Sequence, residues 1–343
     1  MRRWILFMTV LGVLVVGAFA ARYAWRYLVG PATVFKEESR ILLVPTGAGF
    51  EEVVDSLLSL GALRHERAFR WLCERKRFGQ RIHPGRYRIR RGMGMNAMVD
   101  MLRSGEQEPV RVTFNNISRL PELAERLAEK LEPDAASFRR AFEDPTVQAE
   151  LGLDARTMIG LFIPDTYEFW WNTSPEGFIA RMAREHRNFW HDERRAQAKN
   201  LGLDPMRVTT LASIVQAETT RMDDAPRIAG VYLNRLRIGM PLQADPTLKF
   251  ALGLDTVQRI LARDKEVDSP YNTYRYTGLP PGPINMPERR FIDAVLSAEK
   301  HDYLYFCARA DLSGWSEFAR TYDQHLVNAR KYQRALDARG IRR

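Results

Sequence analysis

The sequence has few cysteines, no internal repeat and no low-complexity tract. Repeat proteins and long disordered segments are therefore not indicated, and the low cysteine content limits the possible metal and disulfide sites. Only two cysteines occur, Cys73 and Cys307, and no CxxC pattern is present, so a structural zinc site is not indicated. We expect both to be buried free thiols, while a disulfide between them stays an open alternative in an oxidising compartment. The histidines are scattered, and His186 and His191 lie in a charged, surface-like stretch. The sequence therefore predicts neither a metal nor a cofactor.

Basic residues exceed acidic ones, and the formal net charge is +10 at pH 7. Such an excess can indicate nucleic-acid binding. However, no internal segment combines a stripe of Lys or Arg with regularly interleaved aromatic residues, and part of the excess lies at the two ends of the chain. An anionic membrane surface or an anionic cell-wall polymer accounts for the charge at least as well. Nucleic acid is therefore not an expected partner.

The longest apolar run lies at the N-terminus. Residues 4–21 contain no charged side chain, a length at the short end for crossing a bilayer. One interpretation is a cleaved signal peptide, with Ala18-Phe19-Ala20 as the cleavage site. We favour a retained transmembrane anchor over residues 1–30, because an aromatic and basic collar follows from Arg22 to Tyr27. Both interpretations place the rest of the chain outside the cytoplasm. The expected location is the inner (plasma) membrane, with a single pass and a periplasmic or extracytoplasmic catalytic part.

The remainder predicts an α+β protein of two or three domains. After a linker at 31–40, residues 41–110 alternate strand and helix patterns in a small α+β unit. Residues 111–203 are expected to be a helical connecting region, in which Pro175–Asn200 is amphipathic. Residues 204–335 form the last unit, with predicted helices at 204–219, 225–236 and 322–337 and a hairpin at 303–319. A basic tail, 336–343, ends the chain.

One carboxylate lies on an apolar helical pattern. Leu211, Ile214, Val215 and Glu218 fall at i, i+3, i+4 and i+7, so Glu218 takes the next position of the apolar stripe. Burial would raise its pKa toward that of a general acid. On spacing alone, the simpler alternative is a Glu at a helix end that faces solvent or pairs with Arg221 or Arg227.

Two loops favour a catalytic cleft. The first, Gly239–Thr247, contains Gln243, Asp245 and Thr247 in a proline-containing turn, although Asp245 or Thr247 alone is more simply a helix cap. The second, Tyr271–Ile284, alternates aromatic, amide and hydroxyl side chains before a stiff Gly/Pro run. Aromatic side chains can stack on the CH faces of sugars, and amide and hydroxyl side chains can hydrogen-bond to sugar hydroxyl groups. A proline-rich protein-binding loop is the alternative.

These motifs resemble the MltG/YceG-like endolytic murein transglycosylases. The segments that carry the resemblance are Leu161–Phe169, Ala212–Thr219, Val231–Met240, Leu242–Thr247, Tyr271–Tyr274 and Thr277–Ile284. They occur in family order. The resemblance implies one N-terminal membrane pass, a LysM-like subdomain at 41–110 and a C-terminal α+β catalytic domain. It also implies that peptidoglycan is the substrate, with peptidoglycan synthases as further partners to test.

The resemblance also implies that Glu218 is the catalytic acid and base. The expected substrate-binding residues are Gln243, Asp245, Thr247, Tyr271, Asn272, Thr273 and Tyr274. The sequence departs from the family pattern at three positions: Gln216 stands where many relatives have a carboxylate, Ile159 where Glu is frequent, and Ser316 where His is common. The departure at Gln216 leaves Glu218 as the one acidic candidate in its motif.

The expected reaction is lytic cleavage of the bond between N-acetylmuramic acid and N-acetylglucosamine in nascent glycan strands. It yields 1,6-anhydromuramic ends and would terminate elongation. Two alternatives stay open. One is a non-catalytic peptidoglycan-binding protein. The other is a muramidase that uses Glu218 with a second carboxylate, namely Asp223, Asp224 or Asp245.

Overall fold

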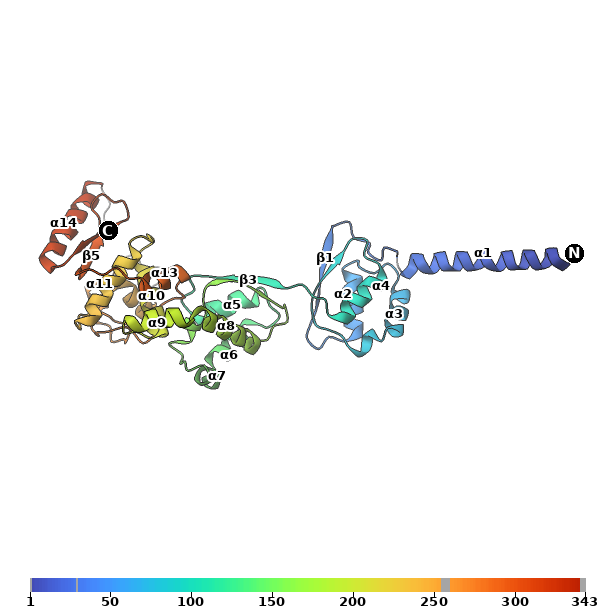
Figure 1. Ribbon diagram of the computed structural model, residues 1–343, viewed down its shortest axis with the longest axis horizontal. Helices are drawn as coiled ribbons and strands as arrows, with labels where there is room; N and C mark the ends of the chain where they lie inside the picture. The colour runs from blue at the N-terminus through green and yellow to red at the C-terminus, as the bar shows by residue number, and fades with distance from the viewer. Residues whose placement is uncertain (1, 29, 254–259, 340–343) are drawn as a thin grey trace. The chain divides into compact units, whose positions relative to one another are not determined.

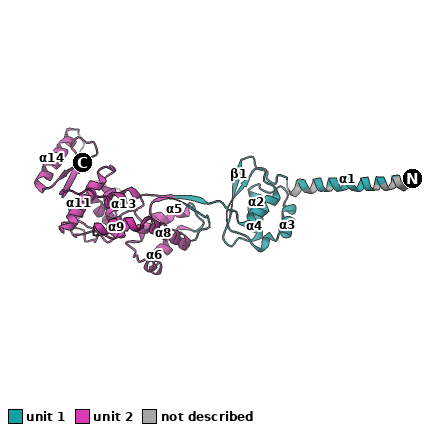
Figure 2. Ribbon diagram, viewed as in Figure 1, with its two compact units in different colours: residues 1–112, 130–133, 167–174 teal, residues 113–129, 134–166, 175–343 magenta. Residues whose placement is uncertain are grey.

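The computed structural model describes residues 2–28, 30–253 and 260–339. It is a mixed α+β structure with small two-stranded sheets, as the sequence predicts. The chain forms two compact units (Figure 2). The smaller one comprises residues 1–112, 130–133 and 167–174, and the larger one comprises 113–129, 134–166 and 175–343. The predicted helical region and the predicted catalytic domain therefore lie largely together in the larger unit.

The smaller unit is built on one antiparallel strand pair, β1 (Ser39–Val44) and β2 (Gly85–Arg90). Alternate residues of these strands, including Leu42, Tyr87 and Ile89, are buried, because successive side chains in a strand point to opposite faces. The helices of this unit are α2 (Phe50–Ser59), α3 (Glu66–Arg75), the short η1 (Phe78–Gln80) and α4 (Met95–Ser104). Their apolar faces complete a common core with the sheet.

The N-terminal segment forms one helix, α1 (Arg2–Leu28) (Figure 1). Within the part of the chain that the structure describes, no helix qualifies as a segment able to cross a bilayer. The anchor therefore stays a prediction.

The larger unit is mainly helical. Its elements, with β3 and β4 continuing into the smaller unit, are β3 (Val110–Phe114), α5 (Leu120–Ala128), α6 (Ala135–Glu143), α7 (Pro145–Glu150), η2 (Met158–Leu161), β4 (Asp165–Phe169), α8 (Pro175–Phe189), α9 (Asp192–Asn200), α10 (Pro205–Glu218), α11 (Ala225–Arg237), α12 (Asp245–Leu252), η3 (Ala262–Glu266), α13 (Arg289–Leu296), β5 (Tyr305–Ala308), β6 (Ser316–Ala319) and α14 (Tyr322–Ala338). Strand β3 pairs with β4, and β5 pairs antiparallel with β6. Helices α10, α11 and α13 pack together and contribute to the hydrophobic core of the larger unit (Figure 1).

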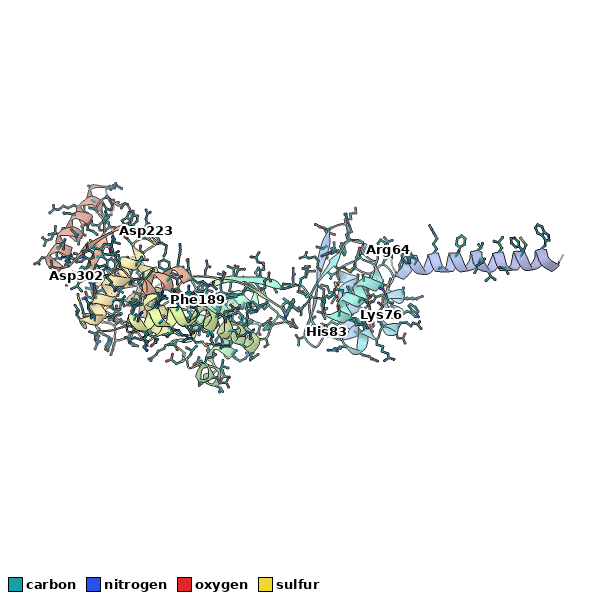
Figure 3. The ribbon with its side chains drawn as sticks, viewed as in Figure 1. Arg64, Lys76, His83, Phe189, Asp223 and Asp302 are labelled. Carbon is teal, nitrogen blue, oxygen red and sulfur yellow. The ribbon has the colours of Figure 1, made fainter. Side chains whose placement is uncertain are left out.

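The amphipathic stretch predicted over Pro175–Asn200 is divided into α8 and α9. The break follows Phe189, which is labelled in Figure 3. Arg194 donates to the carbonyl of Phe189 at 3.2 Å, and Arg195 donates to that of Trp190 at 2.6 Å. Carbonyls at a helix end need such partners, so side chains of α9 replace the bonds that a continuous helix would have made. The spacing of apolar residues in the sequence carries no information about these side-chain hydrogen bonds.

Both cysteines are free thiols, as expected. Cys73 is buried in the smaller unit, but Cys307 on β5 is only partly buried. Burial raises the pKa of both thiols, that of Cys73 to about 12. A buried thiol with a raised pKa is chemically inert at neutral pH, so Cys73 is a packing residue.

Candidate active site

Helix α10 places Glu218 at its last position. The helix begins as the sequence predicts: the Asp204 side chain accepts a hydrogen bond from the backbone N–H of Arg207 at 2.8 Å, and Pro205 occupies the first turn. It ends because Thr219 adopts an extended conformation. Every residue from Val208 to Val215 is buried. The helix is therefore surrounded by protein, which corrects the single apolar stripe inferred from the sequence.

Glu218 lies partly accessible at the end of this buried helix. The hydroxyl of Tyr232 donates a hydrogen bond to its Oε1 at 2.9 Å. Burial raises the pKa of Glu218 to about 7; the Tyr232 bond opposes this rise, and the negative charge of Asp245 adds to it. A carboxyl with a pKa near 7 can hold a proton at rest and still release it, as a general acid requires.

The ion pair with Arg221 or Arg227, one of the simpler alternatives for Glu218, does not form among the described residues. Arg221 donates to the carbonyl of Ser313 at 2.7 Å, and Arg227 pairs with Glu299 at 2.9 Å. Neither guanidinium contacts Glu218 among the described interactions. The carboxyl therefore has a phenol as its direct partner, which permits the neutral form in a way that an ion pair would not.

Helix α11 also supplies a buried basic residue, Arg235, whose charge acts on Glu218. Arg235 is buried, and its guanidinium donates to the carbonyls of Leu304 and Leu242, both at 2.7 Å, and to that of Pro241 at 3.3 Å. These bonds tie the loop before Gln243 to the segment that enters β5. Burial lowers the pKa of Arg235. Its positive charge also favours the ionised form of Glu218.

Three predicted binding residues hold the two loops together. The Thr273 hydroxyl accepts from the backbone N–H of Ala244 at 3.0 Å and shares a 2.8 Å hydrogen bond with the Thr247 hydroxyl. The backbone N–H of Gln243 donates to the carbonyl of Thr273 at 2.9 Å. Asn272 donates to the carbonyls of Val267 and Lys265, at 2.8 and 2.9 Å, and so fastens the second loop to the segment before it. Thr247, Asn272 and Thr273 are all buried, so they position the loops.

The other predicted residues keep accessible surface. Gln243 is exposed and adopts a positive φ of 51°, a conformation that is uncommon outside glycine and is associated with functional loops. Asp245 is exposed at the start of α12, where it accepts a hydrogen bond from the Tyr274 hydroxyl at 2.5 Å. Tyr271 is partly buried, and its ring lies 4.8 Å from that of Phe250. The site thus contains two carboxyl–phenol pairs, Glu218–Tyr232 and Asp245–Tyr274.

The two pairs are electrostatically linked. The Asp245 charge raises the pKa of Glu218, and burial followed by the hydrogen bond to Asp245 raises the pKa of Tyr274. Lys265 lies over the Tyr274 ring, 4.4 Å from its centroid. A neighbouring negative charge disfavours ionisation, so the charge of Asp245 favours the protonated form of Glu218.

The three departures from the family pattern have clear structural positions. Gln216 donates to the Asn116 side chain at 3.1 Å and accepts from the backbone N–H of Glu288 at 2.7 Å, so it joins α10 to two distant segments. No pattern in the sequence indicates this role. Ile159 is buried core. The backbone N–H of Ser316 donates to the buried Asp224 at 2.7 Å, which fixes the β5–β6 hairpin.

We expect Thr273→Val to lower the free energy of unfolding by about 1–3 kcal/mol, because it leaves the buried N–H of Ala244 without its acceptor and removes the hydrogen bond to the Thr247 hydroxyl. It should also raise the KM of the site, since Gln243 and Asp245 lie on the loosened loop. Chemical denaturation and steady-state kinetics measure the two effects. Thr277→Val, an exposed change in the same loop, is the matched control. Equal stability of the two variants would contradict the positioning role.

Comparisons with known proteins identify the family. Residues 42–331 match the model of the YceG-like family. A protein from Bacillus subtilis (strain 168) named endolytic murein transglycosylase is 29% identical over 307 residues, covering 84% of this chain and 83% of that protein. A protein of the same name from Streptococcus pneumoniae serotype 2 is 26% identical over 320 residues, covering 84% of this chain but 57% of that protein. The crystal structure of a yceG-like protein from Listeria monocytogenes matches with a TM-score of 0.57 and 25% identity, over 85% of this chain and 99% of that one.

Proposed function

The chain belongs to the YceG-like family, and from that membership we propose that it is an endolytic murein transglycosylase. Its substrate is peptidoglycan, and the proposed reaction is lytic cleavage between N-acetylmuramic acid and N-acetylglucosamine. The observation that carries the proposal is Glu218, a partly accessible carboxyl whose pKa is about 7, at the end of a buried helix. The names of the relatives support the substrate and the endolytic mode.

The first half of the reaction uses Glu218 as an acid. Its proton passes to the glycosidic oxygen, the bond from that oxygen to C1 of the muramic acid breaks, and positive charge develops on the sugar ring. The leaving N-acetylglucosamine oxygen becomes a hydroxyl. Asp245 is exposed at the start of α12, and the negative charge that acts on Glu218 would also stabilise the cationic ring.

The second half uses the same carboxyl as a base. Glu218, now ionised, accepts the proton of the muramic acid 6-hydroxyl while that oxygen bonds to C1. The product is a 1,6-anhydro end, and Glu218 regains the proton it started with. No water enters the product, so one acid–base group is enough. This differs from hydrolysis, for which glycosidases usually employ two carboxyls.

Mass spectrometry of digested sacculi tests the proposal. We expect the full-length chain to release muropeptides whose muramic acid ends are lighter by one water than reducing ends. The same products after reduction with borohydride should keep their mass, because an anhydro end has no aldehyde to reduce. Products with reducing muramic ends would contradict lytic cleavage, and the absence of any release would favour a binding protein.

One observation favours a muramidase as the second candidate. Asp245 interacts electrostatically with Glu218, so the site does contain a second carboxyl, as hydrolysis would need. The other two carboxyls considered fit less well. Asp224 is buried against the hairpin, and Asp223 is an exposed surface residue, labelled in Figure 3. The mass of the muramic ends decides between the two reactions.

We also propose that the enzyme acts at the outer surface of the inner membrane on newly made strands, and so terminates their elongation. The uncharged run at 4–21 supports this location. The smaller unit is proposed to be LysM-like and to bind glycan. Its order of β1, α2, α3 and β2, with two antiparallel strands, supports that assignment. A pull-down of glycan strands by variants of this unit tests it.

A further inference from the structure

The hydroxyl of Tyr232 is held at one oxygen of the catalytic carboxyl. Tyr232 is only 1% exposed, and its ring packs edge-on against Phe306, with the centroids 5.9 Å apart. It comes from the middle of α11, whereas Glu218 ends α10, and the two helices pack against each other. The 2.9 Å bond from the hydroxyl to Oε1 therefore joins two rigid elements. A rotation of either side chain would leave a buried polar group without a partner.

The bond distinguishes the two oxygens of Glu218. A phenol has one proton, and burial raises the pKa of Tyr232 well above its usual value, so the hydroxyl acts as the donor at neutral pH. Oε1 accepts the hydrogen bond from this hydroxyl, whereas Oε2 has no hydrogen-bond partner among the described residues. Both oxygens of an ionised carboxylate accept hydrogen bonds, but in the neutral acid one of them carries the proton. Because Oε1 already accepts the Tyr232 hydrogen bond, the acid proton of Glu218 is carried by Oε2.

We propose that Tyr232 is a positioning residue that keeps Oε1 as an acceptor throughout the reaction, so that Oε2 both donates the proton to the glycosidic oxygen and accepts it from the 6-hydroxyl. This inference rests on the proposed function of Glu218. The bond forms with both protonation states of the carboxyl, and it is stronger to the ionised one. Tyr232 therefore stabilises the state that exists between the two proton transfers, without touching the substrate.

The pH dependence follows from the groups that face Glu218. Asp245 raises the pKa of Glu218, whereas Tyr232 and Arg235 from α11 and Lys249 from α12 lower it. Burial is the largest influence and raises it. Since the acid must be protonated to act, activity should fall as the pH rises through about 7. Removal of the Tyr232 bond removes one of the influences that lower the pKa, so this fall should move to higher pH.

The test compares Tyr232→Phe with the wild type. We expect the alkaline limb of kcat/KM to move up by about one pH unit, the difference made by one hydrogen bond to a charged group. We expect kcat below pH 6 to fall by about 10–100-fold, because the proton is no longer confined to Oε2 and the ionised acid is less stable. KM should stay within about twofold, since Tyr232 does not touch substrate. An unmoved limb with wild-type kcat would overturn the proposal.

The matched control is Tyr87→Phe. This buried tyrosine donates to the carbonyl of His83, labelled in Figure 3, at 2.8 Å in the smaller unit. Tyr87→Phe also loses a hydrogen bond from a buried hydroxyl, so its stability should fall by a similar amount. The alkaline limb of its kcat/KM profile should not move. A limb that moved equally in both variants would contradict a specific role for Tyr232.

A second readout separates this inference from the proposed function. The 13C signal of the Glu218 carboxyl, assigned as the one missing in Glu218→Gln, reports the pKa without any turnover. An upward shift of this pKa in Tyr232→Phe supports the positioning role even if the wild type releases no anhydro products. An unchanged pKa contradicts the role even if the wild type is an active transglycosylase.

Discussion

Replacing Glu218 by glutamine is expected to lower the rate of anhydro-muropeptide release by at least about 10²–10⁴-fold, the usual contribution of a general acid–base group. Glutamine has the same shape and can still accept the Tyr232 hydrogen bond at its carbonyl oxygen. It has no proton to donate to the glycosidic oxygen and cannot accept one from the 6-hydroxyl. Mass spectrometry of digested sacculi, with the full-length chain, measures the loss.

The same variant should be folded, and its stability relative to the wild type should depend on pH. The pKa of Glu218 is raised from 4.5 in a free side chain to about 7 in the folded protein. The folded state therefore binds the proton more tightly, and the wild type loses stability as the pH rises from about 4.5 through about 7. Glutamine does not titrate. Its gain over the wild type should be about 2–3 kcal/mol larger at about pH 8 than at about pH 4.

Glu185→Gln is the matched control. This glutamate lies in the same unit and pairs with Arg181 at 2.7 Å on the surface of α8. It removes one negative charge from the chain without changing the site, and activity should stay within about twofold of the wild type, as for a surface substitution. Near-normal activity of Glu218→Gln, with this control equally active, would mean that another residue supplies the proton.

Replacing Arg235 by methionine should have the largest effect on stability. The guanidinium donates to the carbonyls of Leu304, Leu242 and Pro241 in a buried position. Methionine fills much of the same volume but donates no hydrogen bond, so buried carbonyls lose their partner. Leaving a buried acceptor without its donor costs about 1–3 kcal/mol for each group, and more when the lost donor was charged. Urea denaturation of the full-length chain, followed by circular dichroism, measures the change.

The activity of this variant should fall as well, because Arg235 fixes the loop that leads to Gln243 and Asp245. Arg237→Met on the same helix is the matched control. Arg237 is exposed and, among the residues that the structure describes, donates a hydrogen bond only to the side chain of Asn234, at 3.1 Å. A surface change of this kind is usually within about 0.5 kcal/mol. If both variants lost the same small amount of stability, the bonds of Arg235 to the loop would not be important for the fold.

Much of the secondary structure could be predicted because its signals are local. The cap at Asp204, the proline after it and the apolar run that follows define α10 within a few residues of its bounds. The hairpin of β5 and β6 and the last helix, α14, were predicted in the same way. Helices α8 and α9 were not separated, because the bonds that end α8 come from the side chains of Arg194 and Arg195. Spacing of apolar residues does not record such bonds.

The site could be predicted only in part. Glu218 was identified together with both loops, but Thr247, Asn272 and Thr273 look the same in sequence whether they bind a sugar or hold a loop. Their burial, visible only in the folded chain, makes them positioning residues. Tyr232 lay within a family motif without an assigned role, and Gln216 appeared only as a departure from the pattern. Both act through hydrogen bonds to residues on other elements.

The sequence by itself determined the family and the mixed α+β class, and it predicted Glu218 as the acid, because these depend on residue type and short-range spacing. Only the tertiary structure decided how that acid is controlled. The Tyr232 hydroxyl that bonds Oε1 comes from the next helix, and the charge of Asp245 comes from a separate loop. The hydrogen bond from Gln216 to Asn116 joins residues 100 positions apart. The pKa of a carboxyl depends on distance and burial, and both are set by how segments that are distant in sequence pack together.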